Sequence, residues 1–305
     1  MRLVFMGTPH AAVPSLQRLI AGHEIAAVYT QPDRPSGRGQ KLTASPVKQL
    51  ALEQGIEVRQ PLKIKTDEAF EEFQTLNADA AIVVAYGRIL PERWLTAFRL
   101  GAINVHFSLL PKYRGAAPVN WAIANGEDET GVTTMQMDAG LDTGDILVQR
   151  STPITPEENA VDLMGRLSTV GAEVLIETLS TLRDLQPQPQ DHSAATFAPM
   201  MKKEDGLIDW SRPAVEIANR VRGFQPFPTS FTYERGTRLT IWSASAGEGS
   251  GRPGEVMAAA GDELAIGCGD GILRVSEIQP EGKRRLPVRD YLNGAKIAVG
   301  DKLGI

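Results

Sequence analysis

An asparagine and a histidine two positions apart are the first residues in this chain whose types and spacing could do chemistry. Asn104 lies in the apolar run Ala102 to Val105, which has the length of a β-strand, and His106 follows it directly. Side chains two apart on a strand point to one face, so the amide and the imidazole should lie side by side. Such a donor pair suits acyl transfer, where each donor to the oxyanion contributes about 3–4 kcal/mol. An isolated Asn-x-His is more often structural, with the histidine in the core.

A carboxylate could join this pair from the Gly- and Asp-rich segment Asp138 to Asp145, which follows a second predicted strand, Val132 to Met137. In open α/β sheets ligands collect where loops leave the carboxyl ends of strands. The calcium-loop pattern fails because Gly140 and Thr143 occupy positions 3 and 6. We therefore predict no metal site. A carboxylate held near His106 would favour the imidazolium and orient the ring.

The elements that must position these groups follow an α/β pattern. Strand-length apolar runs at Arg2 to Met6, Ile25 to Tyr29 and Ala80 to Ala85 are separated by helically spaced stretches such as Val13 to Ala21 and Pro46 to Gln54. Alternating buried strands and helices indicate a mostly parallel sheet covered on both faces. The sequence predicts a Rossmann-like, doubly wound catalytic domain over residues 1–185.

A second, smaller domain is predicted after the helical stretch Ala160 to Leu182. Residues 186–204 lose periodicity and gain Pro and Gln, as linkers do. Residues 205–305 contain short strand-like runs between Gly-rich turns, which are typical of a small β-barrel such as an OB-fold. These runs are Ser230 to Arg235, Arg238 to Ser243, Gly254 to Met257, Glu263 to Gly267 and Gly271 to Ile278.

Composition excludes some classes of protein. The chain of 305 residues has 42% hydrophobic residues and a net charge of −5, which argues against indiscriminate coating of nucleic acid. No run of about 18 apolar residues occurs, and the start MRLVFMGTPH is typical of a strand entering a turn. Cys268 is the single cysteine, so an internal disulfide or a multi-thiolate metal site is excluded. We expect a cytoplasmic monomer that does not enter membranes.

The sequence N-x-H-x-S-L-L-P from Asn104, followed by R-G-x-x-P from Arg114, resembles the signature of the folate-dependent formyltransferases. Gly7-Thr8-Pro9 and the stretch Val83 to Pro91 also resemble segments of that family, in its order. The resemblance implies a catalytic set of Asn104, His106 and a later aspartate, which here is Asp142. It also implies 10-formyltetrahydrofolate as co-substrate and no metal.

The resemblance further implies folate contacts in two segments, although periodicity alone makes Val83 to Leu90 a core strand. One departure from the family is Phe107, which stands where a small residue is usual and should point away from Asn104 and His106. The implied folate contacts are Ser108, Leu109, Leu110, Pro111, Ala85, Tyr86, Gly87, Ile89, Leu90 and Asp138.

Other segments narrow the resemblance to the family members that act on methionyl-tRNA. These segments are Gln31 to Lys48, Gly131 to Asp138 and Ile208 to Trp210. The expected acceptor is initiator methionyl-tRNA. On this hypothesis its neutral α-amine attacks the formyl carbon, Asn104 and His106 stabilise the oxyanion, and Asp142 assists proton removal. A free α-amine has a pKa of about 8, so it must lose a proton before attack.

Basic residues indicate where the tRNA would bind, although charged runs are more often plain solvated faces. The segment Gln31 to Lys48 is longer than the usual βα connection of about 2–6 residues, and its Gly and Pro should resist regular structure. By resemblance it would order against the acceptor stem, with Arg38 at the end base pair. The candidate contacts are Arg34, Arg38, Lys41 and Lys48 in this loop, and Lys202, Lys203, Arg220, Arg222, Lys283, Arg284 and Arg285 in the second domain.

Three alternatives remain open at the level of sequence. A nicotinamide-dependent dehydrogenase is disfavoured because Gly7-Thr8-Pro9 lacks G-x-G-x-x-G, and no P-loop motif occurs. A formyltransferase acting on a small amine, such as a sugar nucleotide or glycinamide ribotide, would keep Asn104, His106 and Asp142. A catalytically idle RNA-binding module would not depend on His106.

Overall fold

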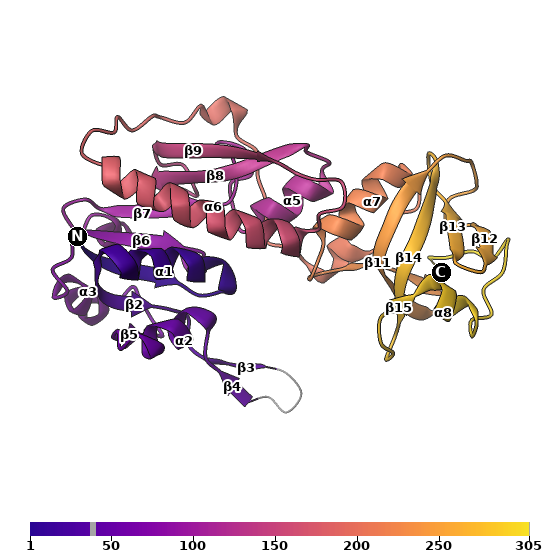
Figure 1. The fold of residues 1–305 in the computed structure, drawn as a ribbon, viewed down its shortest axis with the longest axis horizontal. Coiled ribbons are helices and arrows are strands. Elements are labelled where there is room, and N and C mark those ends of the chain that lie inside the picture. Colours follow the sequence, from indigo (N-terminus) through magenta and orange to yellow (C-terminus); the bar gives the residue numbers. More distant parts are fainter. Residues whose placement is uncertain (37–40, 305) are drawn as a thin grey trace. The chain divides into compact units, whose positions relative to one another are not determined.

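The first part of the chain folds around a seven-stranded sheet in the order β5-β2-β1-β6-β7-β8-β9 (Figure 1). The computed structural model describes residues 1–36 and 41–304. The first five strands in this order, β5, β2, β1, β6 and β7, are parallel, whereas β8 and β9 run antiparallel to their neighbours. The prediction of a mostly parallel α/β sheet is confirmed. The strands are β1 Arg2–Gly7, β2 Glu24–Tyr29, β5 Val58–Arg59, β6 Ala80–Val84, β7 Ala102–His106, β8 Glu129–Gln136 and β9 Ile146–Pro153.

Helices cover this sheet on both faces, as a doubly wound fold requires. On one face Phe73 of α3 stacks on Trp94 of α4 with ring centroids 4.2 Å apart, and Tyr29 meets both rings edge-on. On the other face lies α6, whose Thr178 hydroxyl is 2.7 Å from that of Thr134 in β8. The helices are α1 Val13–Gly22, α2 Pro46–Glu53, α3 Asp67–Gln74, α4 Glu92–Leu95 and α6 Ala160–Thr181.

Three features of the first unit differ from the sequence prediction, and the first is the short strand β5, which was not foreseen. Strand β9 was not foreseen because its apolar run ends at Val148 and four polar residues follow. It lies at the sheet edge, where alternate positions are exposed. The loop after β2 was expected to lack regular structure, which is wrong. Its two sides pair as β3 Arg34–Ser36 and β4 Lys41–Thr43, an antiparallel ribbon that tolerates Pro35 because it has no central strand.

The last third of the chain forms an antiparallel sheet in the order β10-β11-β14-β13-β12, with β15 paired to β14. A buried cluster that includes Trp210, Val221 and Ile241 fills its interior, and helix α7 Ala214–Gly223 contributes Val221 to it. The small antiparallel β domain is as predicted, although β12 begins two residues later than expected. The elements are β10 Ser230–Glu234, β11 Thr237–Gly247, β12 Val256–Ala260, β13 Glu263–Gly267, β14 Ile272–Pro280, β15 Leu286–Pro287 and α8 Val288–Leu292.

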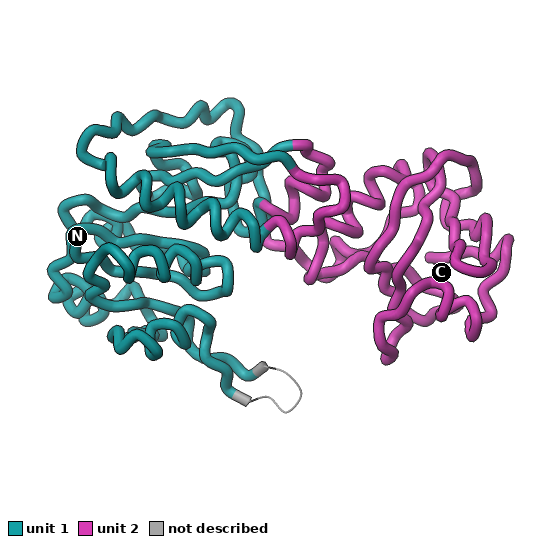
Figure 2. Tube along the Cα trace, in the orientation of Figure 1, with its two compact units in different colours: residues 1–118, 129–153, 164–199 teal, residues 119–128, 154–163, 200–305 magenta. Residues whose placement is uncertain are grey.

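The chain divides by contacts into two compact units that interleave along the sequence (Figure 2). The first comprises residues 1–118, 129–153 and 164–199, and the second comprises 119–128, 154–163 and 200–305. Residues 119–128 join the second unit because helix α5 Pro118–Ala124 packs against α7. The ring of Trp121 meets that of Phe224 at 5.7 Å, and Asn120 Nδ2 donates to Gly223 O at 2.8 Å.

Cys268 is a structural residue of the second unit. Its thiol is buried, and burial raises its pKa to about 11, so the reactive thiolate is not formed at neutral pH.

Within the part of the chain that the structure describes, no helix combines the length and apolarity needed to span a bilayer.

Phe107 packs on the opposite side of the sheet from Asn104 and His106. A Cβ on Gly171 of α6 would lie 3.2 Å from Phe107 Cε1 and 3.1 Å from Val105 Cγ1, so both side chains face this helix. The prediction that Phe107 points away from the polar pair is therefore confirmed. The large ring is accommodated because α6 carries glycine where it crosses.

Two glycines of α6 test this packing. A Cβ on Gly165 meets nothing within 4 Å, so Gly165→Ala should raise stability by about 0.5–1 kcal/mol through helix propensity alone. Gly171→Ala gains the same propensity but presses on two buried side chains, and overpacking costs about 1–3 kcal/mol. Urea denaturation of both variants should thus show opposite signs. Equal stabilisation by the two substitutions would contradict the packing described here.

Candidate active site

The imidazole of His106 is held between a backbone carbonyl and a carboxylate. His106 Nε2 lies 2.9 Å from Tyr113 O, and because a carbonyl only accepts, Nε2 carries the proton of that hydrogen bond. Nδ1 lies 3.7 Å from Asp142 Oδ2, beyond hydrogen-bond distance. The ring is 6% exposed and the Asp142 side chain 15%. A reacting atom placed at this gap could contact both groups.

Asn104 contributes an uncommitted amide to the same face of β7. It pairs in register with Val83 of β6 and Met135 of β8, and it is buried. Within residues 1–36 and 41–304 its side chain makes no hydrogen bond. Since buried amides normally find partners, its donors are available to a ligand.

The loop that carries Asp142 is held by hydrogen bonds to the Asp138 carboxylate and by one from the backbone amide of Gly115. Asp138 Oδ1 accepts from Gly140 N at 3.0 Å and from the Thr143 hydroxyl at 2.6 Å. Asp142 itself has φ 52°, a left-handed conformation that non-glycine residues adopt at a cost. Its Oδ2 accepts from Gly115 N at 2.8 Å. Asp138, predicted as a folate contact, therefore uses one carboxylate oxygen to shape this loop.

The turn after β7 is tied to the neighbouring strands. The Ser108 hydroxyl is fully buried and donates to Lys112 O at 2.6 Å, while Thr133 of β8 donates to Ser108 O at 2.7 Å. Gln149 of β9 donates to Leu110 O at 2.9 Å. Among the predicted folate contacts of this turn, Ser108 and Leu110 are buried, and Leu109 and Pro111 are half-buried.

The segment after β6 presents both exposed and buried residues. Ala85 and Gly87 have φ 47° and 78° and are exposed, and Ile89 is 80% exposed. Tyr86 and Leu90 are instead buried in the core beside Trp94. Burial raises the pKa of Tyr86 to about 12. Ile89 is therefore an exposed apolar side chain in the loop that follows β6, whereas Tyr86 and Leu90 belong to the core.

The root of the β3–β4 ribbon is anchored to the sheet, which changes the role expected for Lys48. Lys48 Nζ lies 2.6 Å from Asp33 Oδ2 and 2.7 Å from Gln60 Oε1, so its charge is neutralised locally. Among the basic residues of this segment, Lys48 therefore has internal partners. Arg34 is exposed, whereas Arg38 and the side chain of Lys41 lie outside the described residues.

The basic residues of the second unit fall into two groups. Lys202, Lys203, Lys283 and Arg284 are exposed. The other three have partners: the guanidinium of Arg222 donates to Thr155 O, Glu158 O and Asn219 Oδ1. That of Arg220 lies 5.4 Å from the ring of Phe224, and Arg285 pairs with Glu277 and lies 5.0 Å from Trp242. Arg222 is therefore a structural residue of this unit.

A polar junction that the sequence did not indicate lies beside Asp142. Gln190, in the segment predicted as a linker, donates to Asp142 O and accepts from Arg114. No motif marks Gln190 because its partners on the loop are backbone carbonyls.

No group of three or more His, Cys, Asp or Glu side chains that could hold a metal is found among the described residues.

Comparison with known proteins places both units in one family. The family model "Formyl transferase" matches residues 1–179, and "Formyl transferase, C-terminal domain" matches residues 200–296. A methionyl-tRNA formyltransferase of Citrifermentans bemidjiense is 51% identical over 100% of this chain and 96% of its own length. One of Caldanaerobacter subterraneus is 51% identical over 98% of this chain and 99% of its own length.

Solved structures share the fold at lower identity. The sugar 3N-formyltransferase WlaRD is 21% identical with a TM-score of 0.68, covering 93% of this chain and 99% of its own. HypX from Aquifex aeolicus, solved with tetrahydrofolic acid, is 21% identical with a TM-score of 0.62, covering 96% of this chain and 47% of its own. At this identity they establish the fold alone.

The Asp33–Lys48 pair predicts a pH-dependent anchor for the ribbon. Hydrogen bonds from Lys48 and Gln60 hold the pKa of Asp33 below its usual value. Because the folded pKa is depressed, the stabilisation is present above the unfolded pKa of about 3.9 and is lost as pH falls through the folded value. Lys48→Met should raise the Asp33 pKa in an NMR titration and cost about 0.5–1 kcal/mol at pH 7.

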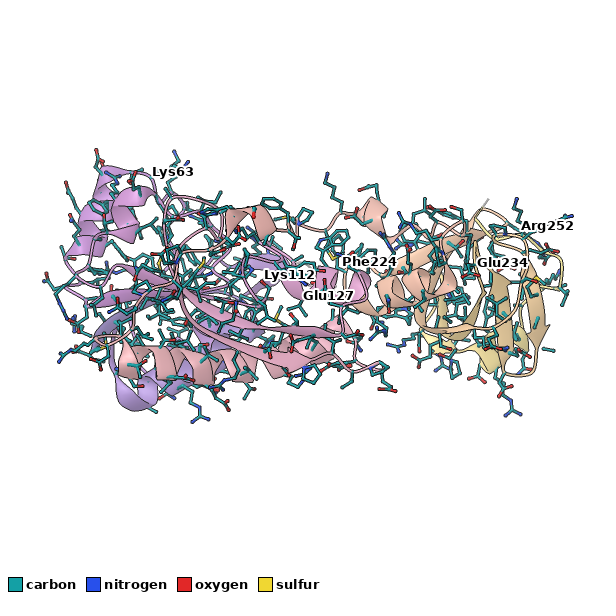
Figure 3. The ribbon with its side chains drawn as sticks, turned by 90° about the horizontal axis from the view of Figure 1, so that it is seen from above. Lys63, Lys112, Glu127, Phe224, Glu234 and Arg252 are labelled. Atoms are coloured by element: carbon teal, nitrogen blue, oxygen red, sulfur yellow. The ribbon has the colours of Figure 1, made fainter. Side chains whose placement is uncertain are left out.

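The matched control is Lys63→Met, which removes an exposed lysine of the same unit (Figure 3). It should leave both the Asp33 titration and the unfolding free energy unchanged. If Asp33 titrates identically in Lys48→Met and in the unmodified protein, the anchor is not electrostatic.

Proposed function

The chain belongs to the formyl transferase family, with methionyl-tRNA formyltransferases at about 50% identity over its whole length, and we propose that Asn104, His106 and Asp142 carry its reaction. The activity is transfer of a formyl group from a folate to the amino group of methionyl-tRNA. The observation that carries the assignment of residues is the His106 Nδ1 to Asp142 Oδ2 gap of 3.7 Å beside the uncommitted amide of Asn104.

Asn104 and His106 serve as donors to the oxyanion. When an amine attacks the formyl carbon, the carbonyl oxygen gains negative charge and is stabilised by donors already in place. The Nε2–H of His106 is used by Tyr113 O, so Nδ1 is the nitrogen that donates to this oxygen, and it must carry a proton to do so. The Asp142 carboxylate lies on the same side of the ring, with its Oδ2 3.7 Å from Nδ1.

Asp142 receives the proton that the attacking amine loses. Its Oδ2 already accepts from Gly115 N, which holds the carboxylate in one orientation. Oδ1 has no hydrogen-bond partner among the described residues and can accept the proton from the amine. The bond between the formyl carbon and N10 of the folate then breaks, and N10 takes up a proton as tetrahydrofolate leaves. A base is required because an α-amine with a pKa of about 8 is largely protonated at neutral pH.

The donor we propose is 10-formyltetrahydrofolate, which supplies an activated formyl group. The exposed residues Ala85, Gly87 and Ile89 offer a surface at the carboxyl end of β6, next to β7 in the sheet. The turn Ser108 to Pro111 would form the other wall. The rigid ties of this turn to Thr133 and Gln149 suit a preformed pocket.

The acceptor we propose is the initiator form of methionyl-tRNA, in translation initiation in the cytoplasm. Exposed Arg34 on the β3–β4 ribbon, with Arg38 and Lys41, would contact the acceptor stem. Lys202, Lys203, Lys283 and Arg284 would neutralise phosphates. These contacts position the nucleic acid, since phosphate carries no sequence information.

The alternative of a small-amine acceptor is less well supported. Sugar formyltransferases share the fold at 21% identity, whereas the relatives at about 50% identity are methionyl-tRNA enzymes over their full length. The ribbon and the second unit with its exposed basic residues have a clear use only for a large anionic acceptor.

Formyl transfer from 10-formyltetrahydrofolate to initiator and to elongator methionyl-tRNA tests the function and the three residues together. We expect formylmethionine from the initiator tRNA. Asn104→Ala, His106→Ala and Asp142→Asn should each lower kcat by about 10²–10³-fold, as loss of an oxyanion donor or a proton acceptor does. His23→Ala, at the start of β2, should be neutral. Full activity of His106→Ala would overturn the mechanism.

Salt dependence tests the RNA contacts. Lys283→Ala combined with Arg284→Ala should raise KM for tRNA and reduce the slope of log K against log salt by about 2, because each phosphate contact contributes about 0.9. The kcat and the KM for folate should not change. Arg252→Ala combined with Lys296→Ala, two exposed residues outside the proposed set, is the control. An unchanged salt slope would remove this pair from the interface.

A further inference from the structure

Residues 188–198 run along both loops of the candidate site instead of hanging free as a linker. Gln188 pairs with Ile146 through two backbone hydrogen bonds of 2.8 and 2.9 Å, directly after the Asp142 loop. Farther along, Arg114 N donates to Thr196 O at 2.9 Å and Ala198 N donates to Arg114 O at 2.7 Å. The segment thus fastens the Asp142 loop and the Arg114 turn to one another.

Gln190 lies between these two attachments, and its amide uses every hydrogen-bonding position. Its Nε2 donates to Asp142 O at 2.9 Å and to Gly144 O at 2.7 Å. Its Oε1 accepts from Arg114 Nη2 at 2.6 Å and Nε at 3.2 Å. The side chain is 6% exposed. No other natural side chain offers two donors and a two-bond acceptor in this shape.

Arg114 is the second half of the junction. It is 4% exposed, and in the described chain its guanidinium meets only neutral acceptors, Gln190 Oε1 and His192 Nδ1. The next residue, Gly115, has φ 122° and donates its amide to the Asp142 carboxylate. A Cβ on Gly115 would lie 2.6 Å from Ala198 O, so the close approach requires glycine.

We propose that Gln190 is a positioning residue that sets the Asp142 carboxylate against His106. Asp142 adopts a left-handed conformation at φ 52°, which persists only when surrounding contacts impose it. Gln190 supplies such a contact because it binds the carbonyls on both sides of Thr143. Without it the loop can relax, and a displacement of about 1 Å at a catalytic group can cost about 10²-fold in rate. This inference rests on the proposed role of Asp142.

Two substitutions separate positioning from bulk stability. Gln190→Leu removes the whole amide, whereas Gln190→Glu keeps the shape and the acceptor for Arg114 but loses both donors to the loop. The glutamate variant forms an ion pair with Arg114, so it is expected to fold even if the leucine variant does not. Both should lower kcat roughly tenfold to a hundredfold, with KM for folate and tRNA within about threefold of the unmodified enzyme.

A double-mutant cycle shows whether Gln190 acts through Asp142. In the Asp142→Asn background, adding Gln190→Glu should lower kcat by less than twofold further, because the group being positioned is already disabled. Gln188→Glu is the matched control: it is the same substitution two residues away, on an exposed side chain that donates to Gln186 O and makes no other hydrogen bond within the described residues. It should retain full activity.

Three results would overturn the inference: unmodified kcat in Gln190→Glu, multiplicative losses in the double variant, or an equal loss in Gln188→Glu. Failure of the proposed function looks different. In that case the unmodified enzyme makes no formylmethionine, or Asp142→Asn alone retains full activity, whatever Gln190 does.

Discussion

The candidate site depends on holding the His106 imidazole and the Asp142 carboxylate close to each other without a direct hydrogen bond between them. His106 Nε2 is held by Tyr113 O, and Asp142 Oδ2 is held by Gly115 N. The distance between His106 Nδ1 and Asp142 Oδ2 is 3.7 Å. A direct hydrogen bond would satisfy both groups and leave nothing for a substrate. The gap is maintained because each partner has a stronger tie to backbone atoms than to the other.

Irregular backbone surrounds this arrangement, although the Asp142 loop leaves the antiparallel strand β8 at the opposite end of the sheet from the loops after β6 and β7. Ala85, Tyr113 and Asp142 all have positive φ, and each lies in a loop after a strand. Such conformations cost free energy and survive where the surroundings over-determine them. Gln190 supplies such a constraint at Asp142, and Thr133 and Gln149 tie the turn after β7 through bonds to Ser108 O and Leu110 O. Strand β9 and the segment after α6 thereby hold the loops around His106 and Asp142 in place.

The second unit uses its charged residues differently from what their positions in the sequence indicated. The guanidinium of Arg222 donates to three neutral oxygen atoms, and Arg285 forms an ion pair with Glu277. Lys283 and Arg284 are exposed. Basic residues close together in sequence are therefore not equivalent as phosphate contacts. Those with internal partners would have to give up a bond to bind RNA.

The sequence by itself determined the local features, because apolar periodicity and alternation are local properties. These features are the strands β1, β2, β6, β7 and β8, the small antiparallel β domain, and the Asn104-x-His106 pair on one strand face. The tertiary structure alone decided the rest. Lys48 pairs with Asp33, β9 forms although half of its residues are polar, and Gln190 meets the Asp142 loop across 48 positions. Contacts between polar side chains and distant backbone leave no periodic signal, since any residue supplies the same carbonyl.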